Sequence, residues 1–334
     1  MLLPMMLVML QALAACDAAS PPPFQADLSQ TATPWTHEDF DAAAGKFTFA
    51  VFSDLTGGER DGIFEVAVAQ MNLLRPEFVI GVGDLIEGGS ENVEQLTVEW
   101  DSFDSRARKA RAPLFYVGGN HDLTNTVMRQ VWEQRYGARY YHFVYKNVLF
   151  LVLDTEDNPP ARMQEIYEAR AVALQRVADE GWAALADTEY SRMPEQTTGT
   201  LGPEQSKYFV DTIADNPDVR WTFLFMHKAP WEREGEQNFA AIERALADRP
   251  YTVFHGHVHA YRHLVRHGRD YIRLGTTGGV QFPDRELSID HVTLVTVDQG
   301  VDIANLRMSG IFDRTGAIPA GGDSLCYDAR ACAE

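Results

Sequence analysis

The sequence has little positive charge. Its 334 residues include 29 lysine and arginine residues against 48 aspartate and glutamate residues, so the formal net charge is −19. Because nucleic-acid backbones are bound mainly by Lys and Arg side chains, this charge argues against a protein that binds nucleic-acid duplexes. A small phosphorylated ligand remains compatible with it, since bound cations would dominate the electric field inside a site.

Cysteine is also scarce, with 3 residues in the whole chain. Cys326 and Cys332 lie in a Gly-rich C-terminal tail, residues 311–334. In an exported protein they would pair as a small disulfide loop, and otherwise they would remain free thiols. No internal repeat and no Ser or Cys nucleophile motif is present, which argues against covalent catalysis through those residues.

A long apolar run occurs at the start of the chain. Residues 1–15 are too few to span a membrane stably and are typical of the apolar region of a signal peptide. The run ends in Leu13-Ala14-Ala15-Cys16, which resembles a bacterial lipobox. That resemblance implies lipidation of Cys16 and a periplasmic, membrane-anchored protein. No Lys or Arg precedes the run, which is atypical of a signal peptide. The alternative to a lipoprotein signal is an ordinary cleaved signal in which Cys16 occurs by coincidence. Residues 16–45, rich in Ala, Ser, Pro and Thr, are predicted to be a linker without a core.

Five later apolar runs each precede residues with metal-ligand chemistry. The runs are predicted as buried strands at 47–52, 78–82, 114–117, 221–225 and 251–254. In open α/β folds, sites assemble in the loops at the carboxyl ends of strands. Carboxylate, amide and imidazole groups gathered there could hold two divalent metals. The residues that follow the runs include Asp54, Asp84, Asn120, His227, His257 and His259.

Strand and helix patterns alternate along most of the chain, which indicates an α/β architecture. Residues 271–274, 292–297 and 301–306 are predicted as strands without a long helix between them, which suits a second sheet. Residues 158–200 are polar and mostly helical and look like an insertion into a domain spanning 46–310. The insertion is either a surface excursion or a lid that shapes access to a site.

Two of the motifs resemble a known family. Gly119-Asn120-His121-Asp122 and Gly256-His257-Val258-His259, in this order and each after a strand, resemble the calcineurin-like metallophosphoesterases, which include the purple acid phosphatases. The resemblance covers residues 46–310. It implies an α/β fold in which two mixed sheets form a sandwich flanked by helices. It also implies hydrolysis of phosphate esters by a metal-activated hydroxide at a dinuclear site.

The resemblance further implies a role for each motif residue. Asp84 would bridge the two metals. Asp54 and His259 would complete the first site, and Asn120, His227 and His257 the second. His121 would face the substrate and assist the leaving group, with Asp122 orienting it; a purely structural His121 is the alternative.

Two positions depart from the family pattern. Thr56 stands where the family commonly has a metal-binding His, and Glu87 stands where purple acid phosphatases have a Tyr. Either residue could be a metal ligand or support one from outside the coordination shell. An oxygen-rich first site would favour Mn²⁺, Mg²⁺ or iron over zinc. The sequence leaves open whether monoesters or diesters are the substrates. A non-catalytic binding lipoprotein with a degenerate site remains the alternative.

Overall fold

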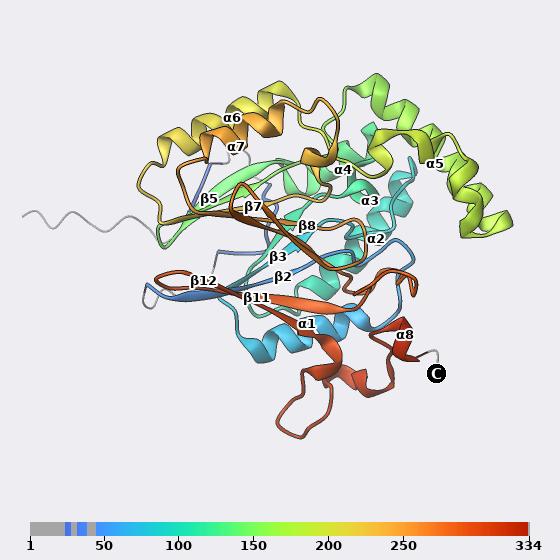
Figure 1. Ribbon diagram of the computed structural model, residues 1–334. Coiled ribbons are helices and arrows are strands. Elements are labelled where there is room, and N and C mark those ends of the chain that lie inside the picture. Colours follow the sequence, from blue (N-terminus) through green and yellow to red (C-terminus); the bar gives the residue numbers. More distant parts are fainter. Residues whose placement is uncertain (1–23, 28–31, 39–44, 333–334) are drawn as a thin grey trace, which may run out of the picture.

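The computed structural model describes residues 24–27, 32–38 and 45–332 (Figure 1). The predicted signal peptide and Cys16 lie outside these residues. Within these described ranges, twelve strands form two sheets. The strands are β1 Phe24–Ala26, β2 Phe47–Phe52, β3 Phe78–Val82, β4 Leu114–Val117, β5 Tyr141–Tyr145, β6 Val148–Val152, β7 Trp221–Phe225, β8 Tyr251–His255, β9 Arg262–Arg266, β10 Arg269–Arg273, β11 His291–Val297 and β12 Val301–Arg307.

The strand order is β12-β11-β2-β3-β4 in one sheet and β1-β5-β6-β7-β8-β10-β9 in the other. Strands β2, β3 and β4 are parallel to one another, as are β6, β7, β8 and β10. The helices are α1 Ile63–Leu74, α2 Val93–Ala107, α3 Asn120–Leu123, α4 Thr126–Tyr136, α5 Pro160–Glu180, α6 Pro203–Asp215, α7 Asn238–Ala245 and α8 Ala329–Cys332.

The two sheets face each other, with helices on both outer faces (Figure 1). Aromatic side chains such as Phe49, Phe78 and Phe150 fill the space between the sheets. Helices α1, α2 and α4 cover the outer face of the five-stranded sheet, and α6 and α7 cover that of the seven-stranded sheet. Parallel strands buried on both faces need continuous apolar runs, which is why these runs stand out in the sequence. The predicted α/β two-sheet fold is confirmed.

The late strands differ from the prediction of a separate second sheet. Strand β10 pairs with β8 in the seven-stranded sheet, whereas β11 pairs with β2 in the five-stranded one. Hairpin-like patterns specify local pairing only, and the choice between two sheets depends on contacts distant in sequence.

Two other segments are more ordered than predicted. Within the expected linker 16–45, β1 pairs with β5, and Trp35 is buried against Phe115 and Tyr141. In the C-terminal segment 311–334, Ile318 and Tyr327 are buried against α1 and its neighbours. A few large apolar side chains anchor both segments although their overall composition is typical of loops.

The segment 158–200, called the insertion below, is mostly helical. It begins with α5, is interrupted at Gly181, and continues through the short 3₁₀ helices η1 Trp182–Asp187, η2 Tyr190–Arg192 and η3 Pro194–Gln196. Helix α5 lies beside α4 at one end of the sandwich (Figure 1). Among the helices of the described residues, none combines the length and apolar character needed to cross a membrane.

Candidate metal centre

The predicted ligand residues come together where the carboxyl ends of strands from both sheets meet. Asp54, Asp84 and Asn120 follow β2, β3 and β4 of one sheet. His227 follows β7 of the other sheet, and His257 and His259 follow β8. Because the strands within each group are parallel, their final residues share one edge of the sandwich.

Four of these residues have backbone conformations that are uncommon for residues other than glycine. The φ angles are 54° at Asp54, 55° at Asp84, 75° at His257 and 57° at His259. Left-handed conformations at such residues persist only where the surroundings enforce them, and they are concentrated at functional sites. Each turns a side chain sharply away from the line of its strand and into the space between the loops.

The side chains form two clusters that share one carboxylate. Asp84, His227 and His257 form one cluster, and Asp54, Asp84 and His259 form the other; within each, the potential ligand atoms lie within 4.8 Å of one another. His227 Nε2 is 3.0 Å from Asp84 Oδ2, and His259 Nε2 is 3.3 Å from Asp54 Oδ1. The shared position of Asp84 is the one that a bridging ligand would need.

Backbone carbonyls hold the histidines in position. His227 Nδ1 lies 3.0 Å from the Val82 carbonyl oxygen, and His259 Nδ1 lies 2.6 Å from that of Val280. His257 Nε2 lies 2.7 Å from the Gln196 carbonyl oxygen. A carbonyl can only accept, so each of these nitrogens carries a proton, and the other ring nitrogen is the one that would bind a metal. This is the arrangement by which proteins orient metal-binding histidines.

The chemistry of the donor groups fits divalent cations. The side-chain oxygen Oδ1 of Asn120 is buried and has no hydrogen-bond partner among the described residues. A buried polar atom without a partner is costly, and a bound cation would supply the missing partner. The carboxylates of Asp54 and Asp84 are also buried, at 0% and 1% exposure, and such charges require a compensating cation.

The pKa shifts of the buried groups, which arise from the protein alone, agree with a need for positive charge at this site. Burial raises the pKa of Asp54 above its usual range. For Asp84, burial acts in the same direction, but His227 and His121 outweigh it and hold the pKa well below its usual range. Burial disfavours a charge on His227, yet Asp84 raises the pKa of that imidazole to about 10. Buried carboxylates and a positive partner therefore stabilise one another here, as carboxylates and a bound cation would.

The hydroxyl of Thr56 is hydrogen-bonded to backbone oxygens, and Thr56 is not part of either ligand cluster. Its hydroxyl lies 2.7 Å from the Ile86 carbonyl oxygen and 3.1 Å from that of Asp84, and it donates its proton to them. The residue is fully buried. Thr56 thereby ties the first loop to the loop that carries Asp84.

We expect Thr56→Val to lower the free energy of unfolding by about 1–3 kcal/mol, because it leaves the buried Ile86 carbonyl oxygen without its side-chain donor. Thr56→Ser keeps the hydroxyl and serves as the control, with a smaller loss. Urea unfolding measures both. Loss of one metal from Thr56→Val at unchanged stability would instead identify Thr56 as a ligand.

Glu87 supports a neighbouring loop. Its Oε1 accepts hydrogen bonds from the backbone N–H groups of Gly58 and Glu59, at 2.9 and 2.8 Å. Its Oε2 lies 3.8 Å from His121 Nδ1. Glu87 belongs to neither ligand cluster, so in this structure it shapes the site from outside the clusters.

The structure corrects the expected pairing of His121 with Asp122. Asp122 accepts hydrogen bonds from the backbone N–H groups of Gly119, Leu85 and Ile86, at 2.8–3.2 Å, and so joins two loops of the site. His121 Nδ1 instead donates to the Glu87 carbonyl oxygen at 2.7 Å. A backbone carbonyl thus orients the imidazole, which the sequence motif could not reveal.

The other nitrogen of His121 faces the helical insertion. His121 Nε2 lies 2.9 Å from Nη2 of Arg170, which is on α5. A guanidinium only donates, so Nε2 accepts and carries no proton in this state. Burial lowers the pKa of His121 to about 4, and Arg170 acts in the same direction, although Asp84 opposes both. The expected proton donation by His121 therefore requires a rearrangement of this contact.

The contacts between the insertion and the site were not predicted from the sequence. Arg170 reaches His121, and Gln196 holds His257 through its carbonyl. Lys228, beside His227, donates to the Glu195 carbonyl oxygen at 2.7 Å. No motif marks these positions, because two of the contacts use backbone atoms and Arg170 is one of several arginines in its segment.

The two expected tail cysteines are joined. The Sγ atoms of Cys326 and Cys332 are 2.11 Å apart, as in a disulfide. The loop that they close lies next to the end of the site: Gln281, which follows the Val280 carbonyl bound by His259, donates to the Tyr327 carbonyl oxygen and accepts from the Ala329 N–H group.

Comparisons with solved structures agree with this fold. A dimetal phosphatase from Danio rerio aligns with a TM-score of 0.51 at 14% identity, over 78% of this chain and 98% of that chain. A purple acid phosphatase from yellow lupin (Lupinus luteus) aligns with a TM-score of 0.53 at 14% identity, over 81% and 53%. The anchor in the inner membrane complex of Plasmodium aligns with a TM-score of 0.50 at 12% identity, over 82% and 87%. At these identities the likeness shows a shared fold.

Sequence comparison identifies the family. No curated protein sequence matches the chain significantly. The family model described as calcineurin-like phosphoesterase, however, matches residues 47–261, which carry every residue of the two ligand clusters. Because this match covers more than half of the 334 residues, the chain belongs to the calcineurin-like phosphoesterase family.

Proposed function

We propose that this protein hydrolyses phosphate esters of small molecules at a centre of two divalent metals. The observation that carries the proposal is the pair of ligand clusters that share Asp84. Asp54 and His259 would hold one cation together with Asp84, and His227, His257 and the Asn120 oxygen would hold the other. When bound, the cations would supply an activated water and neutralise charge on the phosphoryl oxygens.

The surrounding residues prepare the site for this reaction. Backbone carbonyls orient three imidazoles through one ring nitrogen each, and the other nitrogens would bind the cations. Asp122 fixes the loops that carry Asp84 and Asn120 relative to each other. Such fixed geometry is what allows a site to stabilise a transition state without reorganising. The net charge of −19 favours a small phosphorylated substrate over a nucleic-acid duplex.

The test is a metal analysis of the purified protein followed by assays with 4-nitrophenyl phosphate and bis(4-nitrophenyl) phosphate. We expect metal-dependent hydrolysis of at least one ester, which chelation abolishes and re-addition of Mn²⁺, Fe²⁺, Zn²⁺ or Mg²⁺ restores. The relative rates decide between monoesterase and diesterase activity. Protein that holds two metals and hydrolyses neither ester would instead favour a non-catalytic binding role.

We also propose that the protein is exported and anchored to the membrane through lipidated Cys16, which lies outside the described residues. The support is the sequence Leu13-Ala14-Ala15-Cys16 and the disulfide between Cys326 and Cys332, which suits an oxidising compartment.

For Cys16→Ser we expect loss of lipidation, and therefore either release from the membrane fraction or accumulation of the unprocessed chain. Fractionation and mass spectrometry of the N-terminus measure both results. Cys326→Ser is the control, since it removes a cysteine without touching the lipobox. Unchanged processing and location of Cys16→Ser would contradict the proposed anchor.

A further inference from the structure

Arg170 is a buried cation without an anionic partner. It lies in the middle of α5 and is 5% exposed. Within the described part of the chain, its side chain forms no ion pair, and its one hydrogen bond goes to the neutral imidazole of His121 at 2.9 Å. A guanidinium does not lose its charge in proteins, and burying it without a counter-charge is unfavourable by several kcal/mol. Such a group is suited to bind an anion that arrives from outside.

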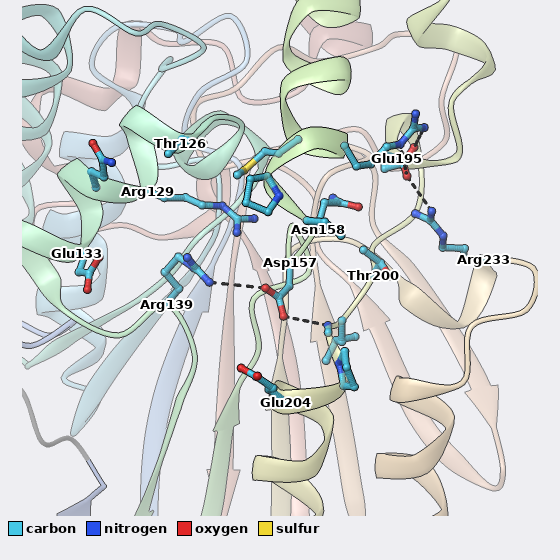
Figure 2. Close-up of a pocket in the computed structure, with 18 residues that line it drawn as sticks. Thr126, Arg129, Glu133, Arg139, Asp157, Asn158, Glu195, Thr200, Glu204 and Arg233 are labelled. Atoms are coloured by element: carbon cyan, nitrogen blue, oxygen red, sulfur yellow. Dashed lines mark hydrogen bonds and ion pairs between the residues drawn. The ribbon is translucent and has the colours of Figure 1, made fainter.

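The nearby arginines have a different arrangement. A groove of ≈ 1010 Å³ beside the base of the insertion contains Arg139, Arg162 and Arg233 (Figure 2). Arg139 pairs with Asp154 and Asp157, whereas Arg162 and Arg233 both pair with Glu195. Each of these three arginines therefore has a carboxylate partner, and Arg162 has a second in Glu165. Arg129 of the same groove instead donates to the carbonyl oxygens of Leu123 and Glu156. Arg170 differs from the first three in having no carboxylate partner, and from Arg129 in that its Nη2 donates to His121, a side chain beside the metal centre.

The insertion contacts three of the loops that form the metal centre. Arg170 contacts His121, Gln196 holds His257, and Glu195 holds Lys228, so it touches the loops after β4, β7 and β8. Between the insertion and the loops lies a cavity of ≈ 10 Å³, lined by Arg170, Asn120 and Lys228 among others. That volume is about the space for one water, so an anion could be bound between Arg170 and Asn120 only if the insertion shifts.

We propose that the insertion 158–200 is a lid and that its Arg170 binds a phosphoryl oxygen of the substrate. Before binding, Arg170 donates to His121 Nε2. When a phosphorylated substrate enters, the guanidinium exchanges this neutral acceptor for the phosphoryl oxygens, which it can bind through two parallel N–H groups. The exchange also releases His121 Nε2 from this contact, so that it can take up a proton from solvent. This inference rests on the proposed phosphoesterase function and assigns its substrate contact to the insertion.

The test compares the metal-loaded wild type with Arg170→Gln and Arg170→Lys. Calorimetric titration with inorganic phosphate measures anion binding, and kcat/KM for the nitrophenyl esters measures the reaction. We expect Arg170→Gln to weaken phosphate binding by about 10- to 100-fold and to lower kcat/KM by about 10²-fold or more, with the metal content unchanged. Arg170→Lys should recover part of both losses, because an ammonium keeps the charge but lacks the planar fork of donors.

Arg176→Gln is the matched control. Arg176 lies on the same helix, but its side chain is 39% exposed and pairs with Glu180 on the surface. Its substitution should leave phosphate binding and turnover unchanged. Should Arg170→Gln fail to fold, Arg170→Lys alone decides, because weaker phosphate binding with both metals present supports the assignment and wild-type binding overturns it.

The outcomes separate this inference from the proposed function. Hydrolysis by the wild type together with unchanged phosphate binding and turnover in Arg170→Gln would overturn the role of Arg170 and leave the phosphoesterase function standing. Phosphate binding that depends on Arg170, in a protein that hydrolyses no ester, would overturn the function and leave the anion site standing. Loss of metal from Arg170→Gln with unchanged phosphate affinity per bound metal would show a structural role and overturn the inference.

Discussion

Asp84→Asn is expected to lower ester hydrolysis by about 10³-fold or more and to reduce the metal content by at least one ion per chain. Asp84 is the one residue that both ligand clusters share. An Asn amide has nearly the same shape but no charge, and it cannot offer two anionic oxygens to two cations. Losing several kcal/mol of charge stabilisation corresponds to a change of this size in rate.

The measurement is metal analysis by mass spectrometry together with kcat/KM for the nitrophenyl esters. Asp104→Asn is the matched control, since Asp104 is a buried carboxylate of α2 that hydrogen-bonds to Tyr136 and belongs to neither cluster. The control should retain both metals and its turnover. Near-normal activity of Asp84→Asn with a full complement of metal would refute the shared-ligand role.

The second large effect is expected from Gly256→Ala. A Cβ atom at this position would lie 2.1 Å from Ser53 Oγ and 2.5 Å from Asp54 Oδ2. Ser53 Oγ donates to Asp54 Oδ2 at 2.6 Å, so the added methyl group would break the contact that holds this carboxylate. Overpacking of this kind lowers the free energy of unfolding by about 1–3 kcal/mol. A shift of about 1 Å in a positioned group can lower kcat/KM by about 10²-fold.

Metal titration and urea unfolding distinguish the two effects. We expect the cation held by Asp54 and His259 to be bound more weakly, while the cation at His227 and His257 is retained. Gly300→Ala is the control because a Cβ atom there has no atom within 4 Å. Equal affinity of both cations in Gly256→Ala and the wild type would show that the loops adjust to the methyl group and that Asp54 is less tightly positioned than the structure indicates.

The two ligand clusters of the centre differ in their number of candidate ligands. The cluster of Asp54, Asp84 and His259 has three candidate ligands, because Thr56 donates its hydroxyl to the backbone. The other cluster has Asp84, His227 and His257, and in the proposed assignment the buried, unpartnered Asn120 oxygen would be its fourth ligand. A cation in the first cluster would depend more heavily on each of its ligands. This explains why a disturbance of Asp54 should have a large effect on its occupancy.

The sequence by itself determined which side chains stand at the ends of the strands. The strands β2, β3, β4 and β7 were predicted with the bounds that the structure shows, because strands buried on both faces require uninterrupted apolar runs. The residues after them lie together because parallel strands end at a shared edge. Local rules of this kind act within a few residues and can be read directly from the chain.

Tertiary structure decided what surrounds these groups. The distribution of β10 and β11 between two sheets, the carbonyls that orient His121, His227 and His257, and the burial of Trp35 all depend on partners far away in sequence. Arg170 is the strongest example: its segment is indistinguishable from an ordinary charged helix until α5 packs over the loops and brings the guanidinium to His121. Contacts made through backbone atoms or through the packing of distant segments leave no local pattern, and so they could not be predicted from the sequence.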